Sequence, residues 1–223
     1  GRTFDAADAA YKTHQTAIAV AFPGHTIDIP TPDDLFSVGT ELVIGQTPAM
    51  DEHHKSVLVQ GRRRVKIIEI VQTEPFMVAK ARILEETEAD DETEILTQTI
   101  ANLFQNAVEL NDTLPDDVIS YALSADNPSW MADFVVSTLT VPLIERQKNL
   151  EEMDINARLR RVAELLNREL DMLELKDEIA GQVHHEIARN QREIYLREQL
   201  RAIQMELGEE DVFQQELNEL HAQ

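Results

Sequence analysis

Two groups of histidines are the residues of this chain that could bind a metal. The run His184-His185-Glu186 lies in a segment with helical spacing. A zinc-protease helix needs His-Glu-x-x-His, which places both imidazoles on one face, but the residue three after Glu186 is Arg189. The pair His53-His54 follows two acidic residues in a predicted loop without a defined set of ligands. We therefore predict no metal site.

Patterns that would indicate catalysis are also missing from the sequence. A phosphate-binding loop needs a glycine followed by lysine and then serine or threonine, and none of the seven glycines is followed by lysine. The chain has no cysteine, which removes thiolate nucleophiles and disulfides. No spacing supports a serine nucleophile with a lysine base. We predict that these 223 residues contain no catalytic residue and no cofactor site.

A short basic run, Arg62-Arg63-Arg64 with Lys66, is the best candidate for contact with a nucleic acid. The formal net charge of the chain is −22, which opposes binding to a phosphate backbone. We favour the alternative interpretation, an exposed strand edge whose charges oppose strand pairing and balance nearby carboxylates. A nucleic-acid-binding module that uses residues 62–66 remains the rival hypothesis.

The residues before position 85 have the texture of short strands. Ile18, Val20 and Phe22 alternate with alanines. Further apolar or β-branched runs, separated by turn formers, are Val38–Ile44, Ser56–Val59, Val65–Val71 and Phe76–Leu84. A short amphipathic helix precedes them. We expect a small, partly closed β-structure with that helix packed against it.

An acidic run marks the change from strand to helix periodicity. Residues 85–94, EETEADDETE, hold seven carboxylates and no base. Such a run repels itself and stays solvated, so it predicts a linker or the exposed start of a helix. We place a domain boundary here, with a β-rich domain over 1–88 and a helical bundle over 89–174.

The helical part begins with an amphipathic pattern from Leu96 to Leu110. Prolines at positions that favour a first helical turn predict three short helices; these prolines are Pro115, Pro128 and Pro142. The residues between them that we expect in the core are Trp130, Met131, Phe134 and Val135. Asp154 is the predicted N-cap of a longer helix. No proline interrupts residues 175–207, so we predict one long helix, either separate from the previous helix or fused to it.

The long helix carries two apolar seams on different faces. At about 100° per residue, the first seam is Leu175, Ile179, Val183 and Ile187, which we expect to dock on its own domain. The second seam lies roughly 110° around the helix and consists of Leu196, Leu200, Ile203 and Leu207. Because a helix cannot bury both faces on one small domain, the second seam needs another subunit or a following domain.

Three stretches resemble the N-terminal, substrate-binding region of Lon-type ATP-dependent proteases. They are PTPDDLFSVGT (30–40), GRRRVKI (61–67) and QREIYLREQLRAIQMELGE (191–209), and the third is similar to the helix that leads into the Lon ATPase module. The resemblance implies an α+β chain in which a PUA-like β pseudo-barrel precedes a helical bundle ending in a long helix. The family normally opens with a proline-containing strand before the position of Gly1, so we expect that strand to be missing and residues 175–223 to lead toward an absent ATPase.

The resemblance also implies function. It implies capture of unfolded or damaged proteins within a cytoplasmic homo-hexamer whose ATP and Mg²⁺ are bound elsewhere in the intact protease. A stand-alone Lon-domain adaptor is the alternative. No apolar run approaches the roughly 20 residues that span a bilayer, so no membrane contact is expected. Such a recognition domain needs exposed apolar residues, for which the candidates are Phe22, Phe36, Met50, Phe76 and Met77; each could instead belong to the core.

Overall fold

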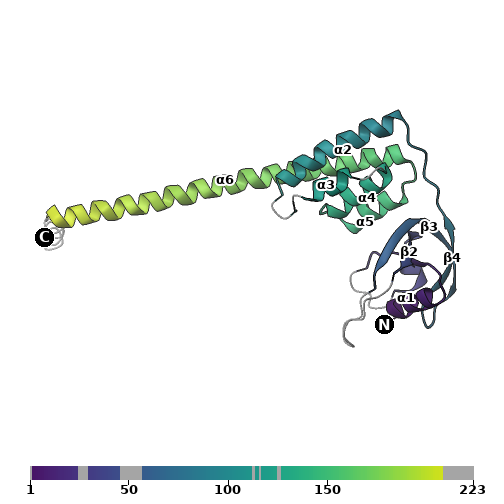
Figure 1. Cartoon of the computed structure of the whole chain (residues 1–223). Coiled ribbons are helices and arrows are strands. Elements are labelled where there is room, and N and C mark those ends of the chain that lie inside the picture. Colours follow the sequence, from purple (N-terminus) through teal and green to yellow (C-terminus); the bar gives the residue numbers. More distant parts are fainter. Residues whose placement is uncertain are drawn as a thin grey trace. The chain divides into compact units, whose positions relative to one another are not determined.

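The computed structural model describes residues 2–24, 30–45, 57–111, 114–115, 117–124 and 127–207. It confirms the predicted α+β class: a four-stranded antiparallel sheet precedes five helices, the last of them long (Figure 1). The chain divides into two compact units, residues 1–170 and 171–223. The sheet and the bundle helices belong to the first unit, and the domain boundary that we place at residue 88 stays a prediction.

The sheet is a meander in the order β1-β2-β3-β4, with every neighbouring pair antiparallel. Its strands are β1 (Ala17–Ala19), β2 (Val38–Ile44), β3 (Val59–Gln72) and β4 (Val78–Ile83). β2 has the bounds that its apolar run predicts. A β-carbon on Gly39 would lie 2.4 Å from the carbonyl oxygen of Ala19. Glycine at this position therefore lets β1 approach β2 closely.

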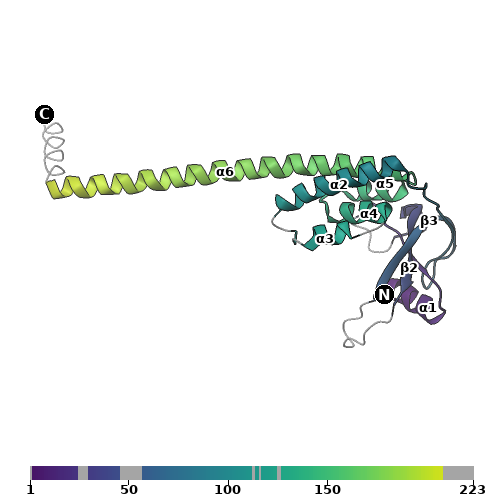
Figure 2. The same cartoon turned by 45° about the horizontal axis from the view of Figure 1, so that its top comes forward.

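The prediction of two strands on either side of the basic run is wrong, because β3 is continuous through it. Residues 59–72 form one strand of 14 residues, which pairs with β2 on one side and with β4 on the other. The basic run is therefore not an exposed strand edge. α1 (Arg2–Lys12) lies against β1 and β2 (Figure 2), with Ala10 buried, and a short 3-10 turn, η1 (Pro32–Asp34), leads into β2.

The bundle consists of short helices around the first turns of a longer one (Figures 1 and 2). The helices are α2 (Asp91–Glu109), α3 (Asp117–Leu123), α4 (Pro128–Thr138), α5 (Leu143–Glu151) and α6 (Ile155–Leu207). Their largest apolar buried side chains are Ile100, Phe104, Met131, Val135, Leu159, Val162 and Leu166. Met131 and Val135 confirm the predicted core. Trp130 does not, because 38% of its surface is exposed.

Side-chain caps fix where these helices begin. The Asn127 side chain accepts hydrogen bonds from the backbone amides of Ser129 and Trp130. The Asp154 carboxylate accepts from the amides of Asn156 and Ala157, which confirms the predicted start of the long helix. Each cap satisfies amides that the first turn leaves without a helical partner, which contributes roughly 1 kcal/mol.

α6 is a single helix of 53 residues, so the two predicted helices are fused. Its buried residues end at Leu170, and none of the described residues 171–207 is buried. Leu175, Ile179, Val183 and Ile187, which we expect to dock on their own domain, belong to the second unit, and each is about half exposed. None of the described helices combines the length and apolarity needed to cross a bilayer.

Candidate functional site

The β3–β4 hairpin exposes apolar side chains because β3 contains two bulges. Its sequence Ile67-Ile68-Glu69-Ile70-Val71 has two apolar doublets. The register with β4 passes from Ile67 to Glu69 and from Ile70 to Gln72, so Ile68 and Val71 are the extra residues. An extra residue in a bulge stays outside the ladder and bends the strand. Ile67 and Ile70 are half-buried, whereas Ile68 is 59% exposed and Val71 is 48% exposed.

Two of the predicted contact residues, Phe76 and Met77, lie in the turn of the same hairpin. Both are half-buried. The Gln72 side-chain amide donates to the carbonyl oxygen of Phe76 across 3.1 Å, and Gln72 pairs with Val78, an exposed residue at the start of β4. The turn is therefore held in place while its apolar side chains remain partly accessible. We call Ile68, Val71, Phe76, Met77 and Val78 the hairpin surface.

Phe22 and Phe36 lie together at another part of the sheet. The amide of Phe36 donates to the carbonyl oxygen of Ala21 across 3.0 Å, so the two aromatic residues are on adjacent backbone segments. Both are half-buried, which leaves core and contact roles open. Phe36 lies just before β2, which begins at Val38. Val38 pairs with Lys66 of β3, so this end of β2 lies beside the part of β3 that leads into the hairpin. Met50 lies outside the described residues.

Sequence reasoning missed Ile68 and Val71 because a β-branched run of this length is typical of a buried strand. A strand with strict apolar–polar alternation places its apolar residues on one face only. The doublets break this period of two, and a glutamate separates them. That departure is the signal from which the bulges, and thus the exposed residues, could have been found.

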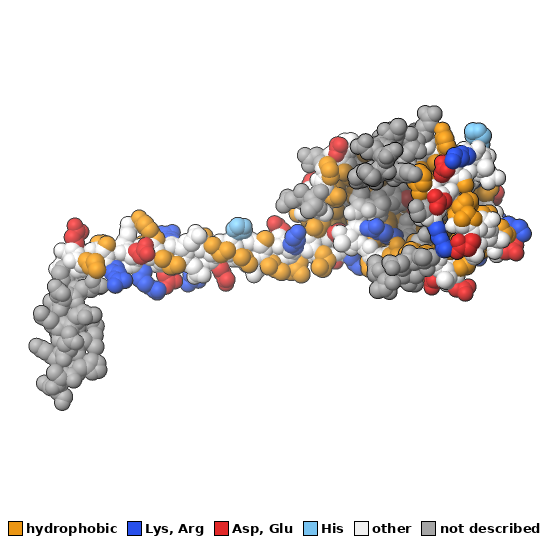
Figure 3. Space-filling model, turned by 90° about the horizontal axis from the view of Figure 1, so that it is seen from below, with side chains coloured by type: hydrophobic (Ala, Val, Ile, Leu, Met, Phe, Trp, Pro, Cys, Tyr) orange, Lys and Arg blue, Asp and Glu red, His pale blue; other side chains and the backbone are white. Residues whose placement is uncertain are grey.

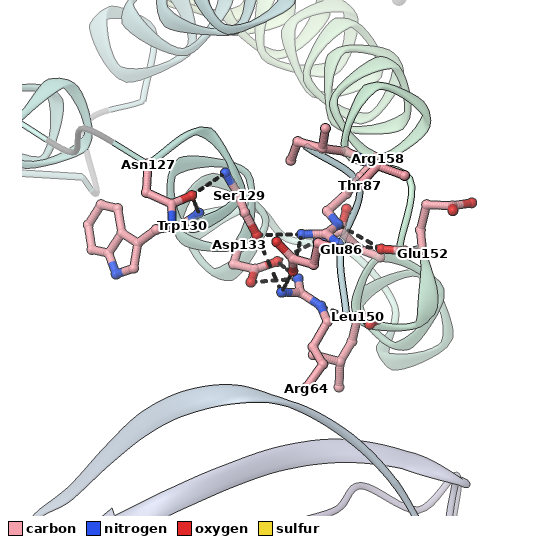
Figure 4. Close-up of polar contacts among 12 residues, drawn as sticks. Arg64, Glu86, Thr87, Asn127, Ser129, Trp130, Asp133, Leu150, Glu152 and Arg158 are labelled. Atoms are coloured by element: carbon pink, nitrogen blue, oxygen red, sulfur yellow. Dashed lines mark hydrogen bonds and ion pairs between the residues drawn. The ribbon is translucent and has the colours of Figure 1, made fainter. Parts of the chain in front are cut away.

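A buried polar cluster joins the sheet to the bundle helices. Arg64 of β3 is only 7% exposed and reaches toward α4 and α5 (Figure 4). Its Nη2 donates to both carboxylate oxygens of Asp133, at 2.5 and 2.6 Å, and its Nε donates to the Leu150 carbonyl oxygen at 3.0 Å. It also pairs with Glu86 of the segment between β4 and α2.

A second arginine, Arg158 of α6, completes this cluster and is fully buried. It donates to Glu86 across 3.0 Å and to the Ser129 hydroxyl across 2.6 Å (Figure 4). Its other donors reach the carbonyl oxygen of Glu152. Two arginines therefore face two carboxylates, Glu86 and Asp133, and the net charge of the group is zero. We call Arg64, Glu86, Ser129, Asp133 and Arg158 the polar junction.

The two carboxyl groups of the polar junction shift in opposite directions. Burial would raise the pKa of Glu86, but the hydrogen bond with Ser129 and the positive charges of Arg64 and Arg158 outweigh it, so that this pKa is lowered. For Asp133, burial dominates over the same two arginines and raises its pKa. Burial and the neighbouring charge of Arg64 lower the pKa of Arg158.

Glu86 is an exception to the solvated acidic run that the sequence predicts. It is half-buried and ion-paired. The next residue, Thr87, donates its amide to the Met153 carbonyl oxygen, and its hydroxyl accepts from the amide of Ile155. The other carboxylates of the run are exposed, as predicted for a helix start, but Thr93 is buried. Asp90 caps α2 by accepting from the amide of Thr93 at 3.0 Å.

The contacts of the polar junction reduce the number of cations that the basic run can offer to a nucleic acid. Arg64 is committed to internal carboxylates, and Arg63 pairs with Glu41 across 2.6 Å. Arg62 and Lys66 are exposed. Two cations on a chain of net charge −22 form a poor counterpart to a phosphate backbone.

The remaining predicted residues lie on α6 or outside the described chain. Leu196, Leu200, Ile203 and Leu207 are each more than half exposed, and apolar side chains follow the length of this helix in the space-filling view (Figure 3). His184 and His185 are also exposed on α6, while His53 and His54 lie outside the described residues. Within the described part of the chain, no three histidine or acidic side chains are grouped to hold a metal ion.

Comparison with known proteins gives consistent matches over most of the chain. Residues 2–168 match the family model described as the ATP-dependent protease La (LON) substrate-binding domain. The chain is 37% identical over 217 residues to Lon protease 2 of Herpetosiphon aurantiacus, covering 97% of this chain and 27% of that protein. It is 36% identical over 195 residues to the Lon protease of Dictyoglomus thermophilum, covering 87% and 25%. The chain thus spans about a quarter of the length of these curated relatives.

Among solved structures, the chain is similar to the N-terminal domain of the Mycobacterium avium complex Lon protease. The TM-score is 0.56 at 22% sequence identity, over 74% of this chain and 83% of that chain. At this identity the likeness concerns the fold alone.

Proposed function

The chain belongs to the family of ATP-dependent protease La (Lon) substrate-binding domains, and from this premise we propose that its hairpin surface captures apolar segments of unfolded or damaged proteins. The observation that carries the proposal is the exposure of Ile68 and Val71 on a strand whose neighbouring residues are held in a ladder. A rigid frame with exposed apolar side chains can bind an apolar segment without first paying a large ordering cost.

The size of the hairpin surface implies weak binding at each site. Burying the exposed parts of Ile68, Val71 and Val78 contributes about 1 kcal/mol each, or roughly a hundredfold in affinity for the three. Weak capture suits a domain that must release many different sequences. Methionine 77 adds an adaptable side chain for such varied contacts.

In the intact protein, this region would deliver captured segments to parts that use ATP and Mg²⁺, within a cytoplasmic homo-hexamer. The support is family membership together with the matched share of the relatives, about a quarter of their length. The whole protease would then supply the unfolding and cleavage, and the present residues would supply recognition and assembly.

We expect the purified chain to bind a permanently unfolded, electrically neutral polypeptide with little dependence on salt. Apolar contact is not screened by ions, whereas contact through Arg62 and Lys66 would be. Binding is measured by fluorescence anisotropy of the labelled polypeptide between about 0.05 M and about 0.5 M NaCl. A folded version of the same polypeptide is the control. Binding that disappears at the higher salt concentration would contradict the proposal and favour the nucleic-acid alternative, which a labelled RNA tests in the same assay.

We further propose that the second seam of α6 contributes to assembly. Leu196, Leu200, Ile203 and Leu207 are exposed at a spacing that suits a paired helix. Burying each leucine-sized side chain contributes roughly 1.5–3 kcal/mol at most, so a second copy of this helix is a sufficient partner.

Replacing Leu200 and Ile203 by glutamate is expected to shift the chain toward the monomer without changing its melting temperature, because neither residue is buried. Sedimentation velocity at high concentration measures the shift. The matched control places the same two charges at exposed polar positions of the same helix, Asn190→Glu with Gln191→Glu. An unchanged sedimentation profile in the Leu200→Glu/Ile203→Glu variant would remove the seam from the assembly mechanism.

A further inference from the structure

The bundle carries a cluster of aromatic side chains that the hairpin surface does not use. Tyr121 of α3 lies 5.3 Å from Trp130 and 5.1 Å from Phe134 of α4, measured between ring centroids. Trp130 and Phe134 are stacked at 5.1 Å with only 6° between their planes. Phe104 of α2 meets Phe134 edge-on at 6.5 Å and is buried. The cluster is therefore anchored in the core on one side. We call Tyr121, Trp130 and Phe134 the aromatic surface.

Two members of the aromatic surface are accessible. Tyr121 is 57% exposed and Trp130 is 38% exposed, while Phe134 is half-buried between them and the core. Trp130 points away from the polar junction (Figure 4). Its backbone is fixed by the Asn127 cap at the start of α4. Large aromatic faces held in place at a surface favour contact with a partner over free rotation in water.

The chain segment that carries the aromatic surface is acidic in sequence. From residue 83 to residue 145 the sequence contains 14 aspartates and glutamates and not one lysine, arginine or histidine. Among the described residues, Asp117 is exposed and lies one helical turn before Tyr121, on the same face of α3. Part of this acidic stretch is paired with arginines: Glu92 with Arg160, Glu145 with Arg161, and Glu86 and Asp133 within the polar junction.

We propose that the aromatic surface binds basic, extended polypeptide segments. Arginine or lysine side chains of the segment would lie over the exposed faces of Trp130 and Tyr121, which attract cations through the ring quadrupole. Asp117 and the acidic stretch around it would add attraction at longer range. The same charge repels nucleic acids and acidic segments. This inference rests on the proposed function, because it names a class of unfolded segment that the domain selects.

Trp130 is the only tryptophan of the chain, so its fluorescence reports on this surface directly. The probe is a synthetic peptide that alternates arginine with small apolar residues and lacks aromatic residues; its partner has glutamate in place of every arginine. We expect the arginine peptide to change the Trp130 emission saturably, with an affinity that falls as salt is added. The glutamate peptide should leave the emission unchanged.

Two substitutions test whether the arginine peptide binds at the aromatic surface. Tyr121→Ala and Asp117→Asn are each expected to weaken binding of the arginine peptide, by up to about tenfold for the loss of a ring face. Both residues are exposed, so circular dichroism should show an unchanged fold. Glu174→Gln removes a charge outside this acidic stretch, at an exposed position of α6, and serves as the control. If Tyr121→Ala alters the fold, Asp117→Asn alone decides.

The neutral unfolded polypeptide, measured in parallel, separates this inference from the proposed function. If that polypeptide binds while the arginine and glutamate peptides bind equally, or leave Trp130 unaffected, the inference is overturned and the proposed function stands. If Tyr121→Ala weakens only the arginine peptide, the aromatic surface is a separate site for basic segments. If only the arginine peptide binds, the proposed role of the hairpin surface fails and the aromatic surface is retained.

Discussion

Replacing Arg64 by methionine should lower the free energy of unfolding by about 2 kcal/mol, because it removes charge-assisted hydrogen bonds to Asp133 and Glu86, whose side chains are only partly exposed. Arg64 is 7% exposed and supplies contacts to Asp133, Glu86 and the Leu150 carbonyl oxygen. These groups come from different elements, so the loss also weakens the connection between the sheet and the bundle helices. Denaturant unfolding, followed by circular dichroism, measures the change.

The neighbouring arginine is a matched control for this experiment. Arg63 pairs with Glu41, but its side chain is substantially exposed, and an exposed ion pair contributes about 0–1 kcal/mol. Arg63→Met should therefore change stability little. Equal effects from the two substitutions would mean that the polar junction is not what joins the sheet to the helices. The double variant Arg64→Met/Asp133→Leu should recover part of the loss, since the half-buried carboxylate at position 133 is then no longer left without this arginine.

Replacing Ile68 and Val71 together by glutamate is expected to weaken binding of an unfolded polypeptide by about thirtyfold or more. Each substitution removes about 1 kcal/mol of apolar contact and adds a charge that resists desolvation. Because both side chains already face water, the free energy of unfolding should change by less than about 1 kcal/mol. Binding is measured with the labelled polypeptide, and stability is measured by thermal unfolding of the same samples.

Ile95 provides the control for the hairpin variant. It is 68% exposed on α2, away from the sheet residues, and has the same side chain as Ile68. Ile95→Glu adds the same kind of charge at an equally accessible position. If Ile95→Glu weakened binding of the unfolded polypeptide equally, binding would not be specific to the hairpin surface, and its proposed role in capture would be contradicted.

Local signals in the sequence predict a large part of the fold. The bounds of β2 follow from an apolar run between turn formers, and the starts of α4 and α6 follow from Asn127 and Asp154. A cap acts within three residues, so its effect is visible in the sequence. The α+β class and the long helix also follow, because each rests on a periodicity sustained over many residues.

The misses at Arg64 and at Glu86 depend on contacts between residues distant in sequence. Arg64 is buried because Asp133, 69 positions later, returns to meet it, and nothing in the basic run distinguishes it from Arg63. Trp130 has a core-like spacing, yet it is 38% exposed. The first seam of α6 lies in the second unit, and its side chains are about half exposed. Ile68 and Val71 could have been found, since the doublets interrupt the alternation of the strand.

The most direct measurement of substrate capture is site-specific photo-crosslinking from the hairpin surface. A photoreactive amino acid is placed at position 68 in one sample and at position 95 in another, and each is irradiated with the same unfolded polypeptide. We predict crosslinks from position 68 that a folded version of the polypeptide does not give, and few from position 95. Crosslinking from position 95 as strong as from position 68, or none from position 68 while the polypeptide is bound, would contradict capture by the hairpin surface.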